Sequence, residues 1–377
     1  MVDNPAVDRM FFDFPAFKHV EWIVDRPSPA YDMAWSNIAP KWKGVIDADL
    51  DHSLLAGSKS TGEQRLVEHL SAEYGVDPSQ VMLTNGCSEA NFLAYISILG
   101  RGSKVLIEKP IYTPLLEIPR AMGCEVHTIK RRPDDYLLDI NELKEKVESL
   151  KPDLLVLQNL NNPSGKGLPA DQLEDVAKIL DKRNIPVLVD EVYRDFAITF
   201  SAGEQIHAFP SMSEIYDRSI ITSSVTKVYG GGGLVTGWLI GPKRVINKAR
   251  RQKIFTVPMV SSIGNRMALS MLKRRQEVLP AEFDSVREKL NLVSAWAKGR
   301  GDVRWSEPDG CAVGFLRYDL DVPSREFCER LFMERGVKVI PGEFFHIEKG
   351  FRFSVSASYD KVKGALTEID SFLDSLG

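Results

Sequence analysis

Residues 154–165 read LLVLQNLNNPSG, an apolar run that passes directly into polar residues and a Pro-Ser-Gly turn. A strand covered on both faces loses the polar and apolar alternation of a half-exposed strand, so the run 154–158 is typical of a buried parallel strand. Pro163 and Gly165 mark a sharp turn after it. The stretch therefore predicts a parallel-sheet member whose carboxyl end carries polar side chains.

Similar short apolar runs recur on both sides of this stretch, at 81–84, 104–108, 126–129, 187–190 and 220–223. The segments between them have helical periodicity. In 170–182, Leu173, Val176 and Leu180 lie on one helical face, opposite acidic residues. The alternation predicts an α/β sheet with helices on both faces.

After about residue 270 the sheet rhythm stops. A long helical segment at 283–298 precedes strand-like runs at 312–316 and 351–355, which indicates a second, α+β domain. Neither internal repeats nor a Gly/Ser linker is visible, so we expect the two parts to pack closely.

Composition excludes several classes of protein. A chain of 377 residues, 44% hydrophobic and 27% charged, is in the globular range, and its net charge of −4 gives no general attraction for nucleic acid or anionic membranes. The first 20 residues are interrupted by charges, unlike a signal peptide, and no apolar run approaches the roughly 18 residues of a membrane span. We expect a soluble, cytoplasmic protein.

Metal and disulfide chemistry is not indicated either. The four cysteines are scattered and form no CxxC pair. His52, His127 and His346 share no metal-ligand spacing, and we interpret them as structural. No metal site is expected.

Ligands of open α/β sheets bind beyond the carboxyl ends of the strands, so polar residues placed there were compared. The stretch 84–90, TNGCSEA, is a strand end followed by a helix start, and free N–H groups at a helix N-terminus suit a phosphate. A simple N-capped helix is the alternative for this stretch taken alone.

Asp190 and Lys227 follow two further strands. A carboxylate that ends an apolar strand must be paired, although Asp190 could instead cap the next helix. Lys227 lies in TSSVTKVYGGGG, residues 222–233. Burial depresses a lysine pKa and favours the neutral amine that Schiff-base chemistry uses, whereas a solvated loop lysine is the alternative.

Taken together and in this order, NNPSG (161–165), DEVY (190–193) and SVTK (224–227) resemble the motifs of fold-type I pyridoxal-phosphate enzymes, specifically the class I/II aminotransferases. The resemblance covers nearly the whole chain. It implies a large α/β domain with a mostly parallel seven-stranded sheet flanked by helices, plus a smaller α+β domain built from the C-terminal part and the N-terminal segment.

The domain limits expected from this resemblance are a segment 1–44 that packs with the small domain and over the active site, a large cofactor-binding domain 45–272, and a small domain 273–377. The cofactor is expected to be pyridoxal 5'-phosphate. The family's active site lies between two subunits, so a homodimer with shared active sites is implied.

The resemblance also assigns roles to residues. Lys227 would form the Schiff base and move the substrate proton, and Asp190 would keep the pyridine nitrogen protonated. Asn162 and Tyr193 would bind the cofactor's phenolic oxygen, and Tyr112 would stack on its ring. Lys227, Asp190 and Tyr193 are thus the expected catalytic residues. The expected phosphate contacts are Gly86, Cys87, Ser88, Ser224 and Thr226.

Arg352, which follows PGEFF (341–345), matches the arginine that grips the substrate α-carboxylate in a two-pronged pair. The alternative is that Arg352 is a surface arginine of a strand. Asn162 is also expected to touch substrate, and Trp35 and Asn37 are candidates for a cover over the site, unless Trp35 is merely packed.

The chain departs from the family where the phosphate should be held. Val235 stands in the place of the family's phosphate-binding arginine, and the stretch 56–61, AGSKST, has no tyrosine. Loss of a charge-assisted hydrogen bond worth roughly 1.5–3 kcal/mol would weaken cofactor binding about ten- to a hundredfold. One hypothesis is that Lys59 reaches across the dimer interface and replaces part of this charge.

The function implied is amino-group transfer between an L-amino acid and a 2-oxo acid. A carbon–sulfur β-lyase on the same fold is the alternative, since the shared residues do not separate the two. A non-enzymatic regulator would carry a basic DNA-binding extension, which is absent. No second arginine is identifiable for a dicarboxylate side chain, so aspartate is unsupported as substrate.

Overall fold

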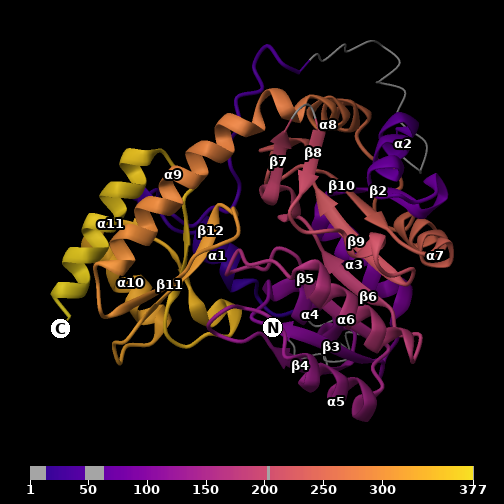
Figure 1. Cartoon of the computed structure of the whole chain (residues 1–377), viewed down its shortest axis with the longest axis horizontal. Coiled ribbons are helices and arrows are strands. Elements are labelled where there is room, and N and C mark those ends of the chain that lie inside the picture. The colour runs from indigo at the N-terminus through magenta and orange to yellow at the C-terminus, as the bar shows by residue number, and fades with distance from the viewer. Residues whose placement is uncertain (1–13, 47–62, 202–203, 377) are drawn as a thin grey trace, which may run out of the picture.

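A computed structural model of the chain describes residues 14–46, 63–201 and 204–376. Figure 1 shows two bodies, a large sheet with its helices and a smaller sheet with the last helices of the chain. The helix α9 (Leu279–Lys298) runs from one body to the other.

The large sheet has seven strands in the order β2-β10-β9-β6-β5-β3-β4, as the resemblance implied. β10 is antiparallel to both neighbours and the other pairs are parallel. β10 was not predicted, whereas the six other strands were. The strands are β2 (Val81–Asn85), β3 (Lys104–Lys109), β4 (Glu125–Lys130), β5 (Leu154–Gln158), β6 (Val187–Asp190), β9 (Ser219–Ser224) and β10 (Thr236–Ile240).

Each face of this sheet is covered by helices, which explains the continuous apolar strands. In β5, Leu154 and Val156 belong to one buried cluster, and Leu155 and Leu157 belong to another on the opposite face. The first cluster includes residues of α3 (Gly86–Ile98), α4 (Thr113–Ala121) and α7 (Lys243–Lys253). The second includes residues of α2 (Gln64–Glu73), α5 (Ile140–Leu150), α6 (Ala170–Asp181) and α8 (Ser262–Arg274).

The small body is an antiparallel sheet in the order β11-β12-β15-β14. Its strands are β11 (Val303–Ser306), β12 (Val313–Tyr318), β14 (Ile340–Pro341) and β15 (Phe351–Ser354), and its helices besides α9 are α10 (Ser324–Arg335) and α11 (Tyr359–Asp374). A separate hairpin, β7 (Ile198–Ser201) with β8 (Glu204–His207), belongs to the large body.

The N-terminal segment packs on the small body. β1 (Tyr31–Asp32) pairs in parallel with β13 (Val337–Lys338), and Trp22 of α1 (Lys18–Val24) donates its indole N–H to the Val339 carbonyl oxygen at 2.8 Å. The limits at 44/45 and 272/273 stay a prediction. In the described ranges, no helix combines the length and apolar character that crossing a membrane requires.

Candidate active site

The carboxyl ends of β5, β6 and β9 open into a cavity of about 380 Å³, which α1 and β15 also line. The structure thus brings together residues from nearly the whole length of the chain. The predicted site residues that line it are Trp35, Gly86, Cys87, Ser88, Tyr112, Asn162, Asp190, Tyr193, Ser224, Thr226, Lys227 and Arg352. Asn37 is not among the lining residues in the described part of the chain.

Lys227 follows β9 and presents its amine to the cavity. Burial of the amine, together with the positive charge of Arg352, lowers its pKa from 10.5 to about 8. A lysine with this pKa has an appreciable neutral fraction near pH 7 to 8, which is the form that attacks a carbonyl carbon.

Asp190 ends β6 and is 2% exposed. Its carboxylate accepts hydrogen bonds from Asn91 Nδ2 at 3.0 Å and from the Val192 N–H at 3.1 Å. Burial raises the pKa of Asp190, and these hydrogen bonds oppose that rise. No ion pair to Asp190 is formed by the described residues, so a cationic group of a ligand would complete its environment.

Asn91 was missed by the sequence reasoning. It lies in α3 and is 2% exposed, and Thr222 donates a hydrogen bond to its side-chain oxygen at 2.6 Å, which orients its amide toward Asp190. An asparagine inside an apolar helix is unfavourable unless its amide has partners. That mismatch was the one signal in the sequence that could have drawn attention to it.

Arg352 lies in β15 and is 1% exposed, so it is not a surface arginine. It donates from Nη1 to Asn162 Oδ1 at 3.1 Å and from Nη2 to the Ala34 carbonyl oxygen at 2.5 Å. Its Nε has no hydrogen-bond partner among the residues that the structure describes. A buried guanidinium whose partners in the described structure are neutral is a suitable receptor for a carboxylate.

The first residues of α3 also line the cavity, as do Ser224 and Thr226. Gly86 has φ +77°, and its position at the start of a 13-residue helix places free N–H groups toward the cavity. Lys227 and Arg352 are the cations among the described lining residues. Lys59, named above as a substitute cation, lies outside the described residues.

Val235 lines this same cavity and is 50% exposed. Its φ is +49°, in the left-handed region that a β-branched residue rarely adopts. The site therefore has a strained, neutral side chain at the position where the family motif has an arginine.

The three predicted aromatic residues of the site differ in their contacts and exposure. The Tyr112 N–H donates to Gln158 Oε1 at 3.0 Å, which fixes the start of α4 against the end of β5. Tyr193 is buried, and burial raises the pKa of its phenol. Trp35 is 49% exposed at the edge of the cavity.

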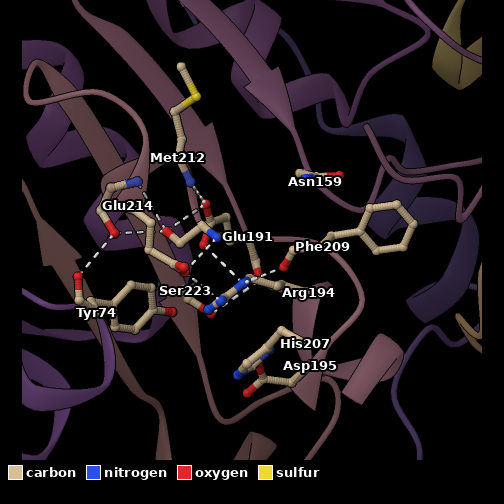
Figure 2. A network of polar contacts seen from close by, with 12 residues as sticks. Tyr74, Asn159, Glu191, Arg194, Asp195, His207, Phe209, Met212, Glu214 and Ser223 are labelled. Atoms are coloured by element: carbon tan, nitrogen blue, oxygen red, sulfur yellow. Dashed lines mark hydrogen bonds and ion pairs between the residues drawn. The ribbon is translucent and has the colours of Figure 1, made fainter. Parts of the chain in front are cut away.

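A second polar network surrounds Glu191, the residue after β6, outside the cavity (Figure 2). Glu191 accepts hydrogen bonds from the Ser211 hydroxyl and from the Met212 N–H, each at 3.0 Å, and faces Arg194 at 3.9 Å. Arg194 in turn donates to Glu214 at 3.0 Å. No motif or spacing in the sequence indicated this network.

Farther along this network, Glu73, Asp195 and His207 have potential metal-ligand atoms within 4.8 Å of one another. Arg275 already lies among them, with its Nη1 at 3.0 Å from Glu73 and 3.7 Å from Asp195. Tyr229, two residues after Lys227, donates to Asp195 at 2.5 Å. We interpret the group as a buried ion network that supports the segment carrying Lys227.

Known proteins resemble this chain over most of its length. Residues 31–369 match the family model for aminotransferase class I and II. An aspartate aminotransferase of Thermotoga maritima is 27% identical over 304 residues, covering 80% of this chain and 77% of that protein. An aromatic-amino-acid aminotransferase of Thermococcus litoralis is 26% identical, covering 98% and 96%.

The fold agrees with these matches. A PLP-dependent aminotransferase structure from Streptococcus suis superposes with a TM-score of 0.86 at 25% identity, covering 97% of this chain and 99% of that one. The family match spans both bodies of the molecule and every strand that contributes to the cavity. The chain therefore belongs to the class I and II aminotransferases, a family of pyridoxal-phosphate-dependent enzymes.

Proposed function

We propose that this chain transfers an amino group between an L-amino acid and a 2-oxo acid, with Lys227, Asp190 and Tyr193 as its catalytic residues. The observation that carries the proposal is the set of three unmatched groups around one cavity. These are an amine of lowered pKa, and a buried carboxylate and a buried guanidinium that form no ion pair within the described ranges.

The lining residues fit pyridoxal 5'-phosphate. When bound, this cofactor supplies an electron sink for the bonds at the substrate α-carbon. Asp190, held by Asn91, matches the cationic ring nitrogen, and its buried charge is thereby compensated. Asn162 and Tyr193 would hold the ring hydroxyl, and Tyr112 would pack on the ring. The phosphate contacts would come from Gly86, Cys87, Ser88, Ser224 and Thr226.

Arg352 and Lys227 act on the substrate in this proposal. Arg352 binds the α-carboxylate through its free donor while Asn162 holds the guanidinium in place. Lys227 would take the proton from the substrate α-carbon in the first half-reaction and return a proton to the same position of the 2-oxo acid in the second. Its pKa of about 8 permits both transfers near neutral pH. Trp35 and Asn37 remain candidates for the cover of the site.

The working form is proposed to be a cytoplasmic homodimer with shared active sites. The segment after α7 exposes four apolar side chains in six residues, and such a patch is unusual on a monomer surface. These side chains are Ile254, Phe255, Val257 and Met259, of which Phe255 is 88% exposed. The four cysteines are free thiols, in keeping with a reducing compartment.

The carbon–sulfur β-lyase alternative is not favoured, because the matching proteins quoted above are named aminotransferases. A relative that makes a different product is nevertheless present in the family, capreomycidine synthase of Streptomyces vinaceus, 25% identical over 334 residues. The reaction therefore has to be measured on this chain.

The test is borohydride trapping of the cofactor followed by peptide mapping. We expect the phosphopyridoxyl mass on the peptide that contains Lys227, and its absence when an amino acid has first converted the cofactor to the amine form. Lys253 is an internal control, since it is a lysine still more buried than Lys227, at 1% exposed, but it is ion-paired with Glu89 at 2.7 Å. Label on Lys253 or spread over surface lysines would contradict the assignment, and release of pyruvate with ammonia would favour the lyase.

A further inference from the structure

The N-terminal helix supplies one wall of the cavity, and that wall is apolar except for one residue. Phe17, Val20 and Ile23 line the cavity from this segment, together with His19. None of these residues was singled out by the sequence. The wall has no part in holding the cofactor under the proposed function, so it is free to meet the substrate side chain.

His19 lies inside an aromatic cluster. Its ring centroid is 5.2 Å from that of Phe345, 5.8 Å from that of Phe17 and 6.2 Å from that of Tyr112, and it stacks on Phe344 at 6.4 Å. Such packing fixes the orientation of the ring. The imidazole is therefore a rigid part of the wall.

One polar atom of this ring lacks a partner in the part of the chain that the structure describes. His19 is 5% exposed, and its Nδ1 has no hydrogen-bond partner among the described residues. A buried nitrogen without a partner is costly, and in a residue that lines a cavity a polar group of a ligand can supply that partner. Burial, Arg352 and Lys227 all lower the pKa of His19, so its ring is neutral near pH 7.

The charges around the cavity limit what can bind against this wall. Lys227 and Arg352 are the cations among the described lining residues, and the proposed function assigns one to the cofactor and the other to the α-carboxylate. A second carboxylate on the substrate would meet Phe17, Val20, Ile23 and a neutral imidazole. Burial of an unpaired carboxylate is strongly unfavourable.

We propose that the wall of Phe17, His19, Val20 and Ile23 selects amino acids with a large uncharged side chain, aromatic ahead of aliphatic, and that His19 hydrogen-bonds a polar group at the end of that side chain. The inference rests on the proposed function, because it takes Arg352 as the receptor of the α-carboxylate. His19 is a specificity-determining residue in this scheme and takes no part in proton transfer.

The test measures binding without turnover. Dissociation constants of three unreactive acids are determined on the holoenzyme from the change in the cofactor's visible spectrum: 3-(4-hydroxyphenyl)propionate, 3-phenylpropionate and succinate. We expect both aromatic monoacids to bind at least about a hundredfold more tightly than succinate, since the second carboxylate of succinate has no cationic partner. We expect the hydroxylated acid to bind about three- to tenfold more tightly than its parent.

Two variants and a control isolate His19. His19→Phe keeps the aromatic packing and should abolish the preference for the hydroxylated acid, whereas His19→Gln should retain part of it. Both variants should bind 3-phenylpropionate within about threefold of the original protein, which shows that the site is intact. His127→Phe, a histidine on β4 paired with Glu125 at 2.6 Å and remote from the lining residues, should change none of the constants.

The half-reaction with amino acids separates this inference from the proposed function. If aspartate and glutamate convert the bound cofactor as efficiently as tyrosine and phenylalanine, or succinate binds as tightly as the monoacids, the specificity inference is wrong and the aminotransferase proposal stands. If no amino acid of the panel converts a cofactor that borohydride still fixes to Lys227, the proposed function fails and this inference fails with it. An unchanged preference in His19→Phe would refute the role of His19 alone.

Discussion

Asp190 and Glu191 are consecutive carboxylates at the end of β6, both 2% exposed, and the protein treats them in opposite ways. Asp190 faces the cavity and is held by neutral donors, Asn91 and the Val192 N–H. Glu191 points into the network of Figure 2, where Arg194, Ser211 and Met212 surround it. Adjacent side chains of a strand end point to opposite sides, so one carboxylate serves the site and the other serves the scaffold.

The difference teaches how to separate a functional carboxylate from a structural one in this molecule. Glu191 has its cation inside the protein, as a buried charge normally does. Asp190 has hydrogen bonds that orient it and no cation among the described residues, which leaves the balancing charge to a ligand.

The largest effect is expected from neutralising the two carboxylates one at a time. Asp190→Asn should reduce kcat/KM by about 10²–10³-fold, because an electrostatic interaction in a water-excluded site is lost, and should leave the free energy of unfolding nearly unchanged. Glu191→Gln should keep kcat/KM within about threefold. Both are measured by steady-state kinetics and urea unfolding of the same preparations. Equal losses of activity would show that the two carboxylates are not functionally distinct.

A smaller effect is expected where the cavity lacks a cation for the anionic end of the cofactor. Val235→Arg adds a charge at a half-exposed position and removes a β-branched residue from φ +49°. Pyridoxal-phosphate affinity should rise about ten- to a hundredfold, with Val235→Gln as the uncharged control. Fluorescence titration of the cofactor-free protein measures this. If glutamine gave the same gain, relief of strain rather than charge would be responsible.

The smallest effect concerns the structural carboxylate. Burial raises the pKa of Glu191 from its ordinary value of 4.5 to about 7, and Arg194 only partly opposes this. Between about pH 4.5 and pH 7 the folded protein therefore binds the proton of Glu191 more tightly than the unfolded chain does. The stabilisation from this proton is complete below about pH 4.5 and is lost as the pH rises through 7. Relative to Glu191→Gln, the original protein should lose about 2–3 kcal/mol of unfolding free energy between pH 5 and pH 8. Urea midpoints at the two pH values give this difference, and parallel curves for the two proteins would contradict it.

Six of the seven strands of the large sheet were predictable from short runs of strand-forming residues, and five of the six are buried along most of their length, which favours such runs over alternation. The sixth, β4, is at the edge of the sheet and is only partly buried. β10 was missed, although Thr236–Ile240 is buried throughout, because it follows the glycine run and Val235 with only a short 3-10 helix, Gly232–Leu234, between it and β9. β10 pairs antiparallel with both β9, its neighbour in the sequence, and β2, the first strand of the sheet. Local pattern carries no information about such a pairing.

The sequence by itself determined the α/β class, the motif residues Asn162, Asp190 and Lys227, and the neutral residue at 235, because each is a property of a short segment. Only the tertiary structure decided which donors hold Asp190, that Glu191 turns away from the cavity, and that Phe17 and His19 form a wall of the site. Those facts depend on contacts between residues far apart in the sequence. Ala34 and Arg352, for example, are hydrogen-bonded across 318 positions. The burial and partners that set the charge of a side chain exist only once these segments have packed.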